Sequence, residues 1–334
     1  DLKPENCIGN THKFDGNRFT YIYNQGTMTE QELNAARDAV DTAGLGKTAK
    51  WIAGVFPSNQ HHLADASKQN SPLELIKSEP LSSGTVLTGK KILTTAPDYF
   101  LLINNGTVAQ IDYASLPGIF NTAKAATEKL ANRIQLETPD PYINTLGGVL
   151  ATTADAIWEN PSYLHGAIAW RIRLPGWRGA YAADVLGWHD RARTHFNAYA
   201  KSQIITPESG PIVSDTALHM ARQLEKVGTS MFSNGYICRN PNGDIRPHHY
   251  DMNLVYIDQL LNHFNWTGDT AYVREMWPVL ERHLAWEKRN FDSDDDGLYD
   301  AYAAIWASDA LQYNGGGVTH TSAYNYRANL SMQK

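Results

Sequence analysis

The sequence predicts a β-rich N-terminal region followed by a helical domain, and two observations support this division. Up to about residue 115, short runs of β-branched and aromatic residues alternate with Gly, Asn and Ser turns, which is typical of a sheet. From Pro117 onward, long amphipathic segments are separated by loops that carry Gly, Pro, His and Asp. We therefore expect a β-rich domain at 1–115, a helical linker at 116–137 and a helical domain at 138–334.

Local patterns predict the individual elements. The expected strands are 18–23, 84–87, 99–103 and 107–113, and Thr29 and Glu32 form a capping box ahead of a helix at 33–40. Residues 57–83 are polar and predict a long surface connection. The expected helices further along the chain are 119–134, 145–158, 181–202, 215–227, 251–264, 269–290 and 321–333. Recurring helix pairs with polar loops between them indicate an array of α-hairpins.

Composition excludes several classes of protein. The chain has 334 residues, of which 42% are hydrophobic and 19% charged, so it can bury a core in each of two domains. A net charge of -6 and a pI near 6.1 leave no excess of basic residues to neutralise phosphates. Apolar runs are broken by Asp, Arg, His or Gly before they reach the length of a bilayer span. We expect neither a nucleic-acid partner nor a membrane span.

The two cysteines and the first residue bear on the compartment. Cys7 and Cys238 are too few for a disulfide framework and lack metal-ligand spacing. The chain begins at Asp1 without a methionine, as in a processed secreted protein or a chain trimmed for expression. A periplasmic or extracellular location is the expectation.

The aromatic residues point to a class of ligand. Nine Trp and 17 Tyr occur in the chain, and many lie between residues 158 and 326 beside Gly, Asp, Arg and His. Sugar rings pack their C–H bonds on aromatic faces while planar polar groups bind their hydroxyls, so a carbohydrate is the expected substrate. An ordinary aromatic core is the alternative.

An acidic segment after residue 290 predicts a structural calcium site. Asp292, Asp294 and Asp296 alternate ahead of Gly297, as at the start of a calcium loop, and Asp300 lies where a further ligand would be. The twelfth position is Ala303 instead of a bidentate Glu, which excludes an EF-hand. The alternative is a solvated acidic turn between two helices. No other cofactor is expected.

The same segment carries a resemblance to a known superfamily. Asp296-Gly-Leu, a short distance before Trp306-Ala-Ser-Asp309, resembles the loop of six-hairpin glycosidases in which D-x-D-G-L precedes the general-acid Asp. Residues 177–191 are similar to an uncharacterised bacterial family of that superfamily, related to debranching-enzyme and trehalase-like glycoside hydrolases. The resemblance covers about residues 138 to 330. It implies a toroid of (α/α)6 type and hydrolysis of glycosidic bonds in an oligo- or polysaccharide.

Glycoside hydrolysis needs a protonated carboxylic acid and a second carboxylate. The resemblance makes Asp309 the predicted acid, with Trp306 raising its pKa by lowering the local polarity and with Tyr313 and Asn314 holding the substrate. The alternative is that Asp309 merely caps the next turn.

A second group of candidates lies between residues 170 and 191. Asp184 is the best second carboxylate in view, although in related enzymes the base lies in a later hairpin. The alternative is a set of ion pairs on a helix surface with Trp188 in the core. The predicted substrate-binding residues of this group are Trp177, Arg178, Trp188, His189 and Asp190.

A third group and two other functions complete the predictions. His249 and Asp251 are expected to line the substrate site, and a helix cap is the simpler role of Asp251. A polysaccharide lyase acting on uronates is an alternative, with catalytic residues Tyr250, His249, Asn325 and Arg327. A non-catalytic glycan-binding protein is another.

The length of the helical region bears on the completeness of the toroid. A ring of twelve helices needs roughly 350 residues at typical helix and loop lengths, whereas about 220 follow the β-rich region. We expect a toroid that is incomplete in this chain and continues beyond Lys334. The sequence does not predict an oligomeric state.

Overall fold

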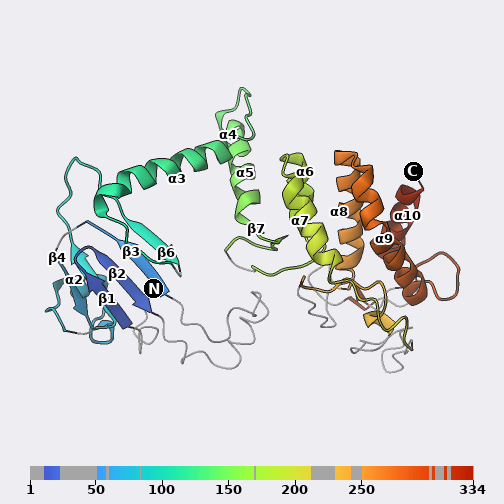
Figure 1. Ribbon diagram of the computed structural model, residues 1–334, viewed down its shortest axis with the longest axis horizontal. Coiled ribbons are helices and arrows are strands. Elements are labelled where there is room, and N and C mark those ends of the chain that lie inside the picture. The colour runs from blue at the N-terminus through green and yellow to red at the C-terminus, as the bar shows by residue number, and fades with distance from the viewer. Residues whose placement is uncertain are drawn as a thin grey trace. The chain divides into compact units, whose positions relative to one another are not determined.

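The computed structural model describes residues 11–22, 51–57, 60–82, 84–104, 106–168, 171–211, 230–241, 250–300, 303–304, 312–313 and 317–333. These residues form two compact units, one ending at Leu130 and the other beginning at Ala131. Helix α3 (Leu116–Ala131) ends at this division (Figure 1). The first unit is rich in strands and the second consists mainly of helices, so the predicted order of β-rich and helical regions is confirmed.

An antiparallel sheet with strand order β1-β2-β3-β6 forms the centre of the first unit. Gly54 pairs with Phe19 on one side and Leu102 on the other, and a Cβ atom there would lie 2.4 Å from the Phe19 ring. Only glycine therefore fits at this position. The strands of the unit are β1 (Thr11–Asp15), β2 (Arg18–Ile22), β3 (Trp51–Val55), β4 (Gln60–Ala64), β5 (Val86–Lys90) and β6 (Leu101–Asn104).

Two predictions for this unit are wrong. The expected surface connection at 57–83 contains β4, which pairs with β5, and helix α2 (Pro72–Lys77), whose Leu75 is buried. The polar sequence of β4 lacks the alternation of apolar and polar residues that indicates a strand. The expected strand at 107–113 is a loop that ends in a 3₁₀ turn, because Ser115 bonds back to the Asp112 carbonyl. The helix predicted at 33–40 lies outside the described residues.

The second unit is built from helices with two short strand pairs, β7 (Trp158–Glu159) with β8 (Ser162–Tyr163) and β9 (Ala303–Ala304) with β10 (Gln312–Tyr313). The single helix predicted at 181–202 is two helices, because Gly187 adopts a φ of 68° and reverses the chain. The helix predicted at 215–227 lies outside the described residues. The helices are α4 (Pro141–Asn144), α5 (Leu146–Ala156), α6 (Gly179–Val185), α7 (His189–Ala200), α8 (Met252–Thr267), α9 (Thr270–Phe291) and α10 (Thr319–Met332).

Helix α8 contacts both α6 and α10, and we call these three helices one layer; they run in the same direction. Gly176, just before α6, packs against the Met252 carbonyl at the start of α8, and Asp184 near the end of α6 contacts His263 near the end of α8. Helix α10 begins beside the end of α9, where the Val318 amide bonds to the Tyr299 carbonyl. Helices α7 and α9 run the opposite way, since each follows its predecessor through a short turn.

This arrangement gives the helical unit two different ends. At one end, which we call the turn end, residues 186–188 join α6 to α7 and residues 268–269 join α8 to α9. At the other, which we call the loop end, the chain makes three long connections, 157–178, 201–251 and 292–318. Two of these connections meet there, because Tyr250, just before α8, stacks on Phe291, the last residue of α9, with ring centroids 5.3 Å apart.

Helix α8 occupies the middle of the unit. Every residue from Met252 to Leu261 is buried, although the stretch includes Asn253, Asp258 and Gln259. The apolar residues of α8 pack with Phe196 of α7, Leu280 of α9 and Ala328 of α10 in one cluster. A helix that is buried on all sides needs a hydrogen-bond partner for each polar side chain.

His195 of α7 is a buried connector within this core. Its Nδ1 accepts a hydrogen bond from the Tyr163 amide at 3.2 Å, and its Nε2 lies 3.3 Å from the Pro175 carbonyl. These partners require a neutral ring with the proton on Nε2. Burial lowers the pKa of His195 to about 4.

The lowered pKa of His195 predicts acid sensitivity. Histidine in an unfolded chain titrates near pH 6.5, so between about pH 6.5 and pH 4 the unfolded chain binds a proton that the folded chain excludes. As the pH is lowered through this window, the free energy of unfolding should therefore decrease, by up to about 1.4 kcal/mol per pH unit from this group. Urea denaturation at pH 7 and pH 5 measures the slope. The His195→Gln variant should show a shallower slope, and an unchanged slope would contradict the assignment.

The packing around α8 predicts the cost of a cavity. Leu280 is fully buried in the central cluster, so Leu280→Ala should lower the free energy of unfolding by about 2–5 kcal/mol. The control is Leu330→Ala on α10, where the side chain is 43% exposed and the expected change is within about 0.5 kcal/mol. Equal effects of the two variants in chemical denaturation would rule out the packing described.

Candidate functional site

The predicted sugar-binding and catalytic residues divide between the two ends of the helical unit. Trp177, Arg178 and Asp251 lie at the loop end, where Trp177 is partly buried, Arg178 exposed and Asp251 buried. Asp184, Trp188, His189 and Asp190 lie at the turn end. His249, Trp306, Asp309, Asn314 and the side chain of Tyr313 lie outside the described residues.

The connection that includes Asp309 is anchored at the loop end. Strands β9 and β10 pair on either side of residues 305–311, and Asp300 forms an isolated bridge with Gly317. The Asp300 amide donates to the Phe291 carbonyl at 2.5 Å, which fixes this bridge beside the last residue of α9. The predicted acid therefore belongs to a connection that leaves from the loop end.

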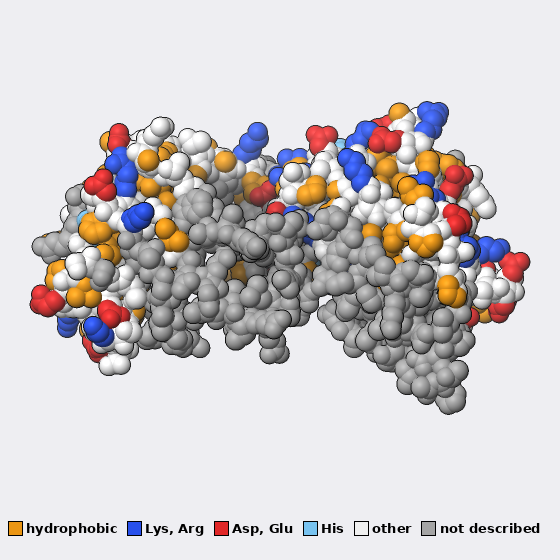
Figure 2. Space-filling model, turned by 60° about the horizontal axis from the view of Figure 1, so that its bottom comes forward, with side chains coloured by type: hydrophobic (Ala, Val, Ile, Leu, Met, Phe, Trp, Pro, Cys, Tyr) orange, Lys and Arg blue, Asp and Glu red, His pale blue; other side chains and the backbone are white. Residues whose placement is uncertain are grey.

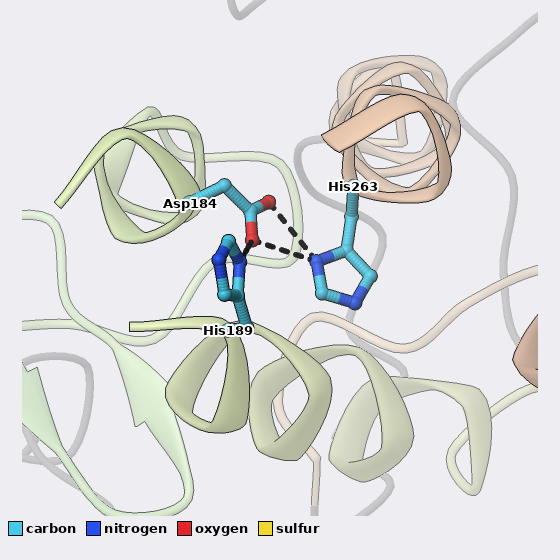
Figure 3. Close-up of side chains that lie close together, drawn as sticks. All are labelled: Asp184, His189 and His263. Carbon is cyan, nitrogen blue, oxygen red and sulfur yellow. Dashed lines mark hydrogen bonds and ion pairs between the residues drawn. The ribbon is translucent and has the colours of Figure 1, made fainter. Parts of the chain in front are cut away.

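Three polar side chains converge at the turn end (Figure 3). His189 Nδ1 lies 2.7 Å from Asp184 Oδ1, and His263 Nδ1 lies 2.8 Å from the same oxygen and 3.0 Å from Oδ2. The side chains of Asp184 and His263 are 4% and 3% exposed, whereas that of His189 is 46% exposed. Asp184 thus joins α6 to the start of α7 and to α8.

This placement argues against the prediction that Asp184 is the second catalytic carboxylate. Imidazoles contact both of its oxygens, and its side chain is almost inaccessible to solvent. His263 lies roughly 16 Å along α8 from Met252, at the end opposite to the long connections. A carboxylate that activates water for an acid at the loop end has to be nearer to that end.

The other predicted residues at the turn end have structural contacts. The Trp188 ring packs against two apolar clusters and lies under the guanidinium groups of Arg191 and Arg133, at 4.4 and 5.0 Å from its centroid. The core interpretation of Trp188 therefore explains its position better than a sugar platform does. Asp190 is exposed in the first turn of α7, where a negative charge stabilises the helix.

At the loop end, Trp177 is partly buried and contacts two other residues through its carbonyl and its ring. Its carbonyl accepts a hydrogen bond from Gln259 Nε2 at 2.8 Å, and its ring meets His165 edge-on with centroids 4.0 Å apart. The guanidinium group of Arg178 lies 5.9 Å from the same ring. Asp251 directly precedes α8, but its side chain makes none of the capping hydrogen bonds expected among the described atoms.

A polar cluster that crosses α6, α8 and α10 was not predicted. At its centre, the Asp258 carboxylate accepts hydrogen bonds from the Tyr181 hydroxyl and from Asn262 Nδ2, and Arg327 Nε lies 2.5 Å from Oδ1. Arg327 also donates to Asn262 Oδ1 at 3.1 Å. We call Tyr181, Asp258, Asn262, Tyr324 and Arg327 the helix-face cluster.

Burial is the main cause that raises the pKa of the two tyrosines in the helix-face cluster, and the charges around them add to or oppose this shift. Burial and then the hydrogen bond to Asp258 raise the pKa of Tyr181 well above its ordinary value. Burial and the Asp258 charge raise the pKa of Tyr324, while Arg327 and Arg178 oppose the shift. Both phenols therefore stay protonated at neutral pH and serve as hydrogen-bond donors. Asp258 lies roughly 9 Å along α8 from Met252, nearer to the loop end than Asp184.

Of the residues predicted for a lyase, the three that the structure describes are not assembled as that mechanism requires, and His249 lies outside the described residues. Tyr250 is buried and stacked on Phe291, and Asn325 is buried with its amide bound to Glu287 Oε2 at 3.0 Å. Arg327 pairs with Asp258 instead. A base and a carboxylate-neutralising pair would have to face a substrate together, so these contacts disfavour the lyase set.

The surface is mixed in charge. Figure 2 shows Lys and Arg side chains interspersed with Asp and Glu over the described part of one face. Among the described residues, no helix is both long and apolar enough to span a bilayer.

The acidic loop after α9 brings three carboxylates together. One oxygen from each of Asp292, Asp294 and Asp296 lies within 4.8 Å of the others. Asp292 Oδ1 accepts the Gly297 amide at 3.1 Å, and Gly297 has a φ of 80°. Asp300, the predicted fourth ligand, is not one of these three. The calcium site stays a prediction.

Calcium binding at this loop is tested by thermal melting. If Asp292, Asp294 and Asp296 hold Ca²⁺, millimolar calcium should raise the Tm of the wild type, because an ion that binds the folded state stabilises it. Asp294→Asn should abolish that rise. The control is Asp295→Asn, since Asp295 pairs with Lys288 at 2.5 Å outside the group. A wild-type Tm that does not respond to calcium would identify a solvated turn.

Comparison with known proteins gives one partial match. Residues 1–124 match a family described as a domain of unknown function (DUF4450). No curated protein and no solved structure matches the chain. The matched family covers the β-rich unit and does not extend over the helices that carry the candidate site.

Proposed function

We propose that the chain is a glycoside hydrolase whose substrate binds at the loop end of the helical unit. The observation that carries this proposal is the meeting of the three long connections where α6, α8 and α10 begin. Catalytic and binding groups concentrate on long loops held by a rigid scaffold. The predicted general acid and most of the predicted sugar-binding residues belong to these connections.

The proposed fold of the helical unit is an α-hairpin toroid of (α/α)6 type. Two consecutive hairpins, α6–α7 and α8–α9, support it, since each places one helix in the layer with α10 and one outside that layer. Repetition of this unit around an axis would surround the loop end with connections of the same kind.

Asp309 is the proposed general acid, and Asp258 takes the place of Asp184 as the proposed second carboxylate. Asp258 lies on the middle helix of the layer, between Tyr181 and Arg327, and its side chain is 11% exposed. Arg327 has a side chain that is 57% exposed, so the ion pair is at the surface and can open at little cost. The proposed mechanism is paired-carboxylate hydrolysis.

The proposed substrate is a glycan with an acidic sugar. Arg327 pairs with Asp258 in the cluster, and Arg178 is exposed directly before α6 and opposes the rise in the pKa of Tyr324. Guanidinium groups bind carboxylates through paired hydrogen bonds, and the protonated Tyr181 and Tyr324 can donate to sugar hydroxyls. A uronate-containing polysaccharide is therefore the first substrate to try.

The proposal is tested with the full-length protein on a panel of plant and microbial polysaccharides, with release of reducing ends as the measurement. Asp309→Asn and Asp258→Asn should each lower kcat by about 10²- to 10⁴-fold, the usual contribution of a general acid or base. The matched control is Glu281→Gln, an exposed carboxylate on α9 that should leave the rate unchanged.

Each other outcome identifies a different function. Full activity in Asp309→Asn would show that Asp309 is not the general acid. Loss of activity in Asp184→Asn but not in Asp258→Asn would identify Asp184 as the second carboxylate. Products that absorb in the near ultraviolet would identify a lyase. Binding without turnover would identify a glycan-binding protein.

A further inference from the structure

The turn end of the helical unit combines ligand atoms from three helices at one point. Asp184 of α6, His189 at the start of α7 and His263 of α8 each offer one atom, and these three atoms lie within 4.8 Å of one another. Both histidines present Nδ1, and both Nδ1 atoms face the same carboxylate (Figure 3). Asp184 and His263, which are 79 residues apart in sequence, are thereby joined by a hydrogen bond.

The imidazole partners of Asp184 carry a positive charge only when they are protonated. The carboxylate is buried, and its described partners are the two imidazoles; no lysine or arginine forms an ion pair with it among the described residues. Burial of a carboxylate without a cation is costly. A divalent cation bound between the three atoms would supply a positive charge that does not depend on protonation of the imidazoles.

The donor set selects the kind of ion. Two imidazole nitrogens and one carboxylate oxygen suit Zn²⁺ and similar divalent transition metals, whereas Ca²⁺ and Mg²⁺ prefer oxygen ligands alone. Bonds of about 2.1 Å would place neighbouring ligand atoms roughly 3.0–3.4 Å apart. The observed nitrogen–oxygen distances of 2.7 to 3.0 Å are slightly shorter, so binding requires the atoms to separate by a few tenths of an ångström.

The surroundings permit that adjustment and leave an entry path. His263 is held by aromatic neighbours, with ring centroids 5.4 Å from Phe196 and 5.6 Å from Tyr272. His189 is half exposed and lies at the first position of α7, so its ring can move outward. Two fixed ligands and one mobile ligand at the surface would leave the remaining coordination positions to water.

We propose that Asp184, His189 and His263 bind a divalent transition-metal ion of the Zn²⁺ type. The ion replaces the hydrogen bonds between the imidazoles and the carboxylate and links α6, α7 and α8 at the turn end. This site is independent of the proposed hydrolase centre, which lies towards the other end of the same helices.

Metal titration of the full chain tests the proposal. After chelation and buffer exchange, Zn²⁺ titration followed by calorimetry should reveal a stoichiometric site, and Co²⁺ should give a visible absorption band. His189→Ala should weaken the binding by at least tenfold and remove the Co²⁺ band, since even outer-shell partners of a metal typically contribute 10- to 100-fold. Asp184→Asn should act in the same direction. The matched control is His62→Ala, which removes an imidazole that bonds to Ser78 in the first unit and should leave the binding unchanged.

The possible results separate a metal site from a hydrogen-bonded bridge. If the wild type binds no Zn²⁺, or if His189→Ala binds as tightly as the wild type, the proposal is overturned and the three residues form a hydrogen-bonded bridge. If a variant fails to fold, as judged by circular dichroism, crystals of the wild type soaked in Zn²⁺ decide. An anomalous peak between the three side chains supports the site, and its absence there overturns it.

Discussion

The central constraint on the helical unit is the burial of residues 252–261 of α8 on every side. A buried helix has to find a partner for each polar side chain, and those partners determine where the neighbouring segments lie. Asn253 holds both the amide and the carbonyl of Ile237, and Gln259 holds the Trp177 carbonyl. Tyr256 bonds to α7, while Asp258 and His263 reach α6 or α10. Apolar packing drives the helices together, but these hydrogen bonds set their register.

The sequence predicted the regular parts of this structure better than its irregular parts. The helix around Met276 was predicted within two residues, since its apolar periodicity and its capping residue are local signals. The C-terminal helix was also predicted within two residues, although its N-cap residue Val318 makes no side-chain capping hydrogen bond. The break at Gly187 was missed, because a single left-handed glycine inside a helical pattern is compatible with either outcome. Strand β4 was missed because its pairing with β5 is a tertiary feature that polar side chains conceal.

The site was predicted less well, for a physical reason. Asp184 and His189 were predicted as members of one dense group of Trp, Arg, His and Asp residues, and they are in contact. Their partner His263 and the carboxylate Asp258 belong to a helix that reads as an ordinary core segment, so no local motif distinguishes them. Tyr181 and Arg327 contact Asp258 only because the fold brings α6, α8 and α10 together. Chemistry built across helices is not visible in the spacing along one of them.

The unequal ends of the helices have a consequence for how such a protein can diverge. At the turn end, Gly187 and Gly268 adopt left-handed conformations in short reversals, and a buried carboxylate ties the adjoining helices together, so insertions there would disturb the core. The long connections at the other end contact the helices through particular residues, such as Met231 and Ile237, which bond to Trp286 of α9 and Asn253 of α8. Natural variation and deliberate loop exchange should therefore accumulate at one end, and ligand preference can change while the helical framework is inherited intact.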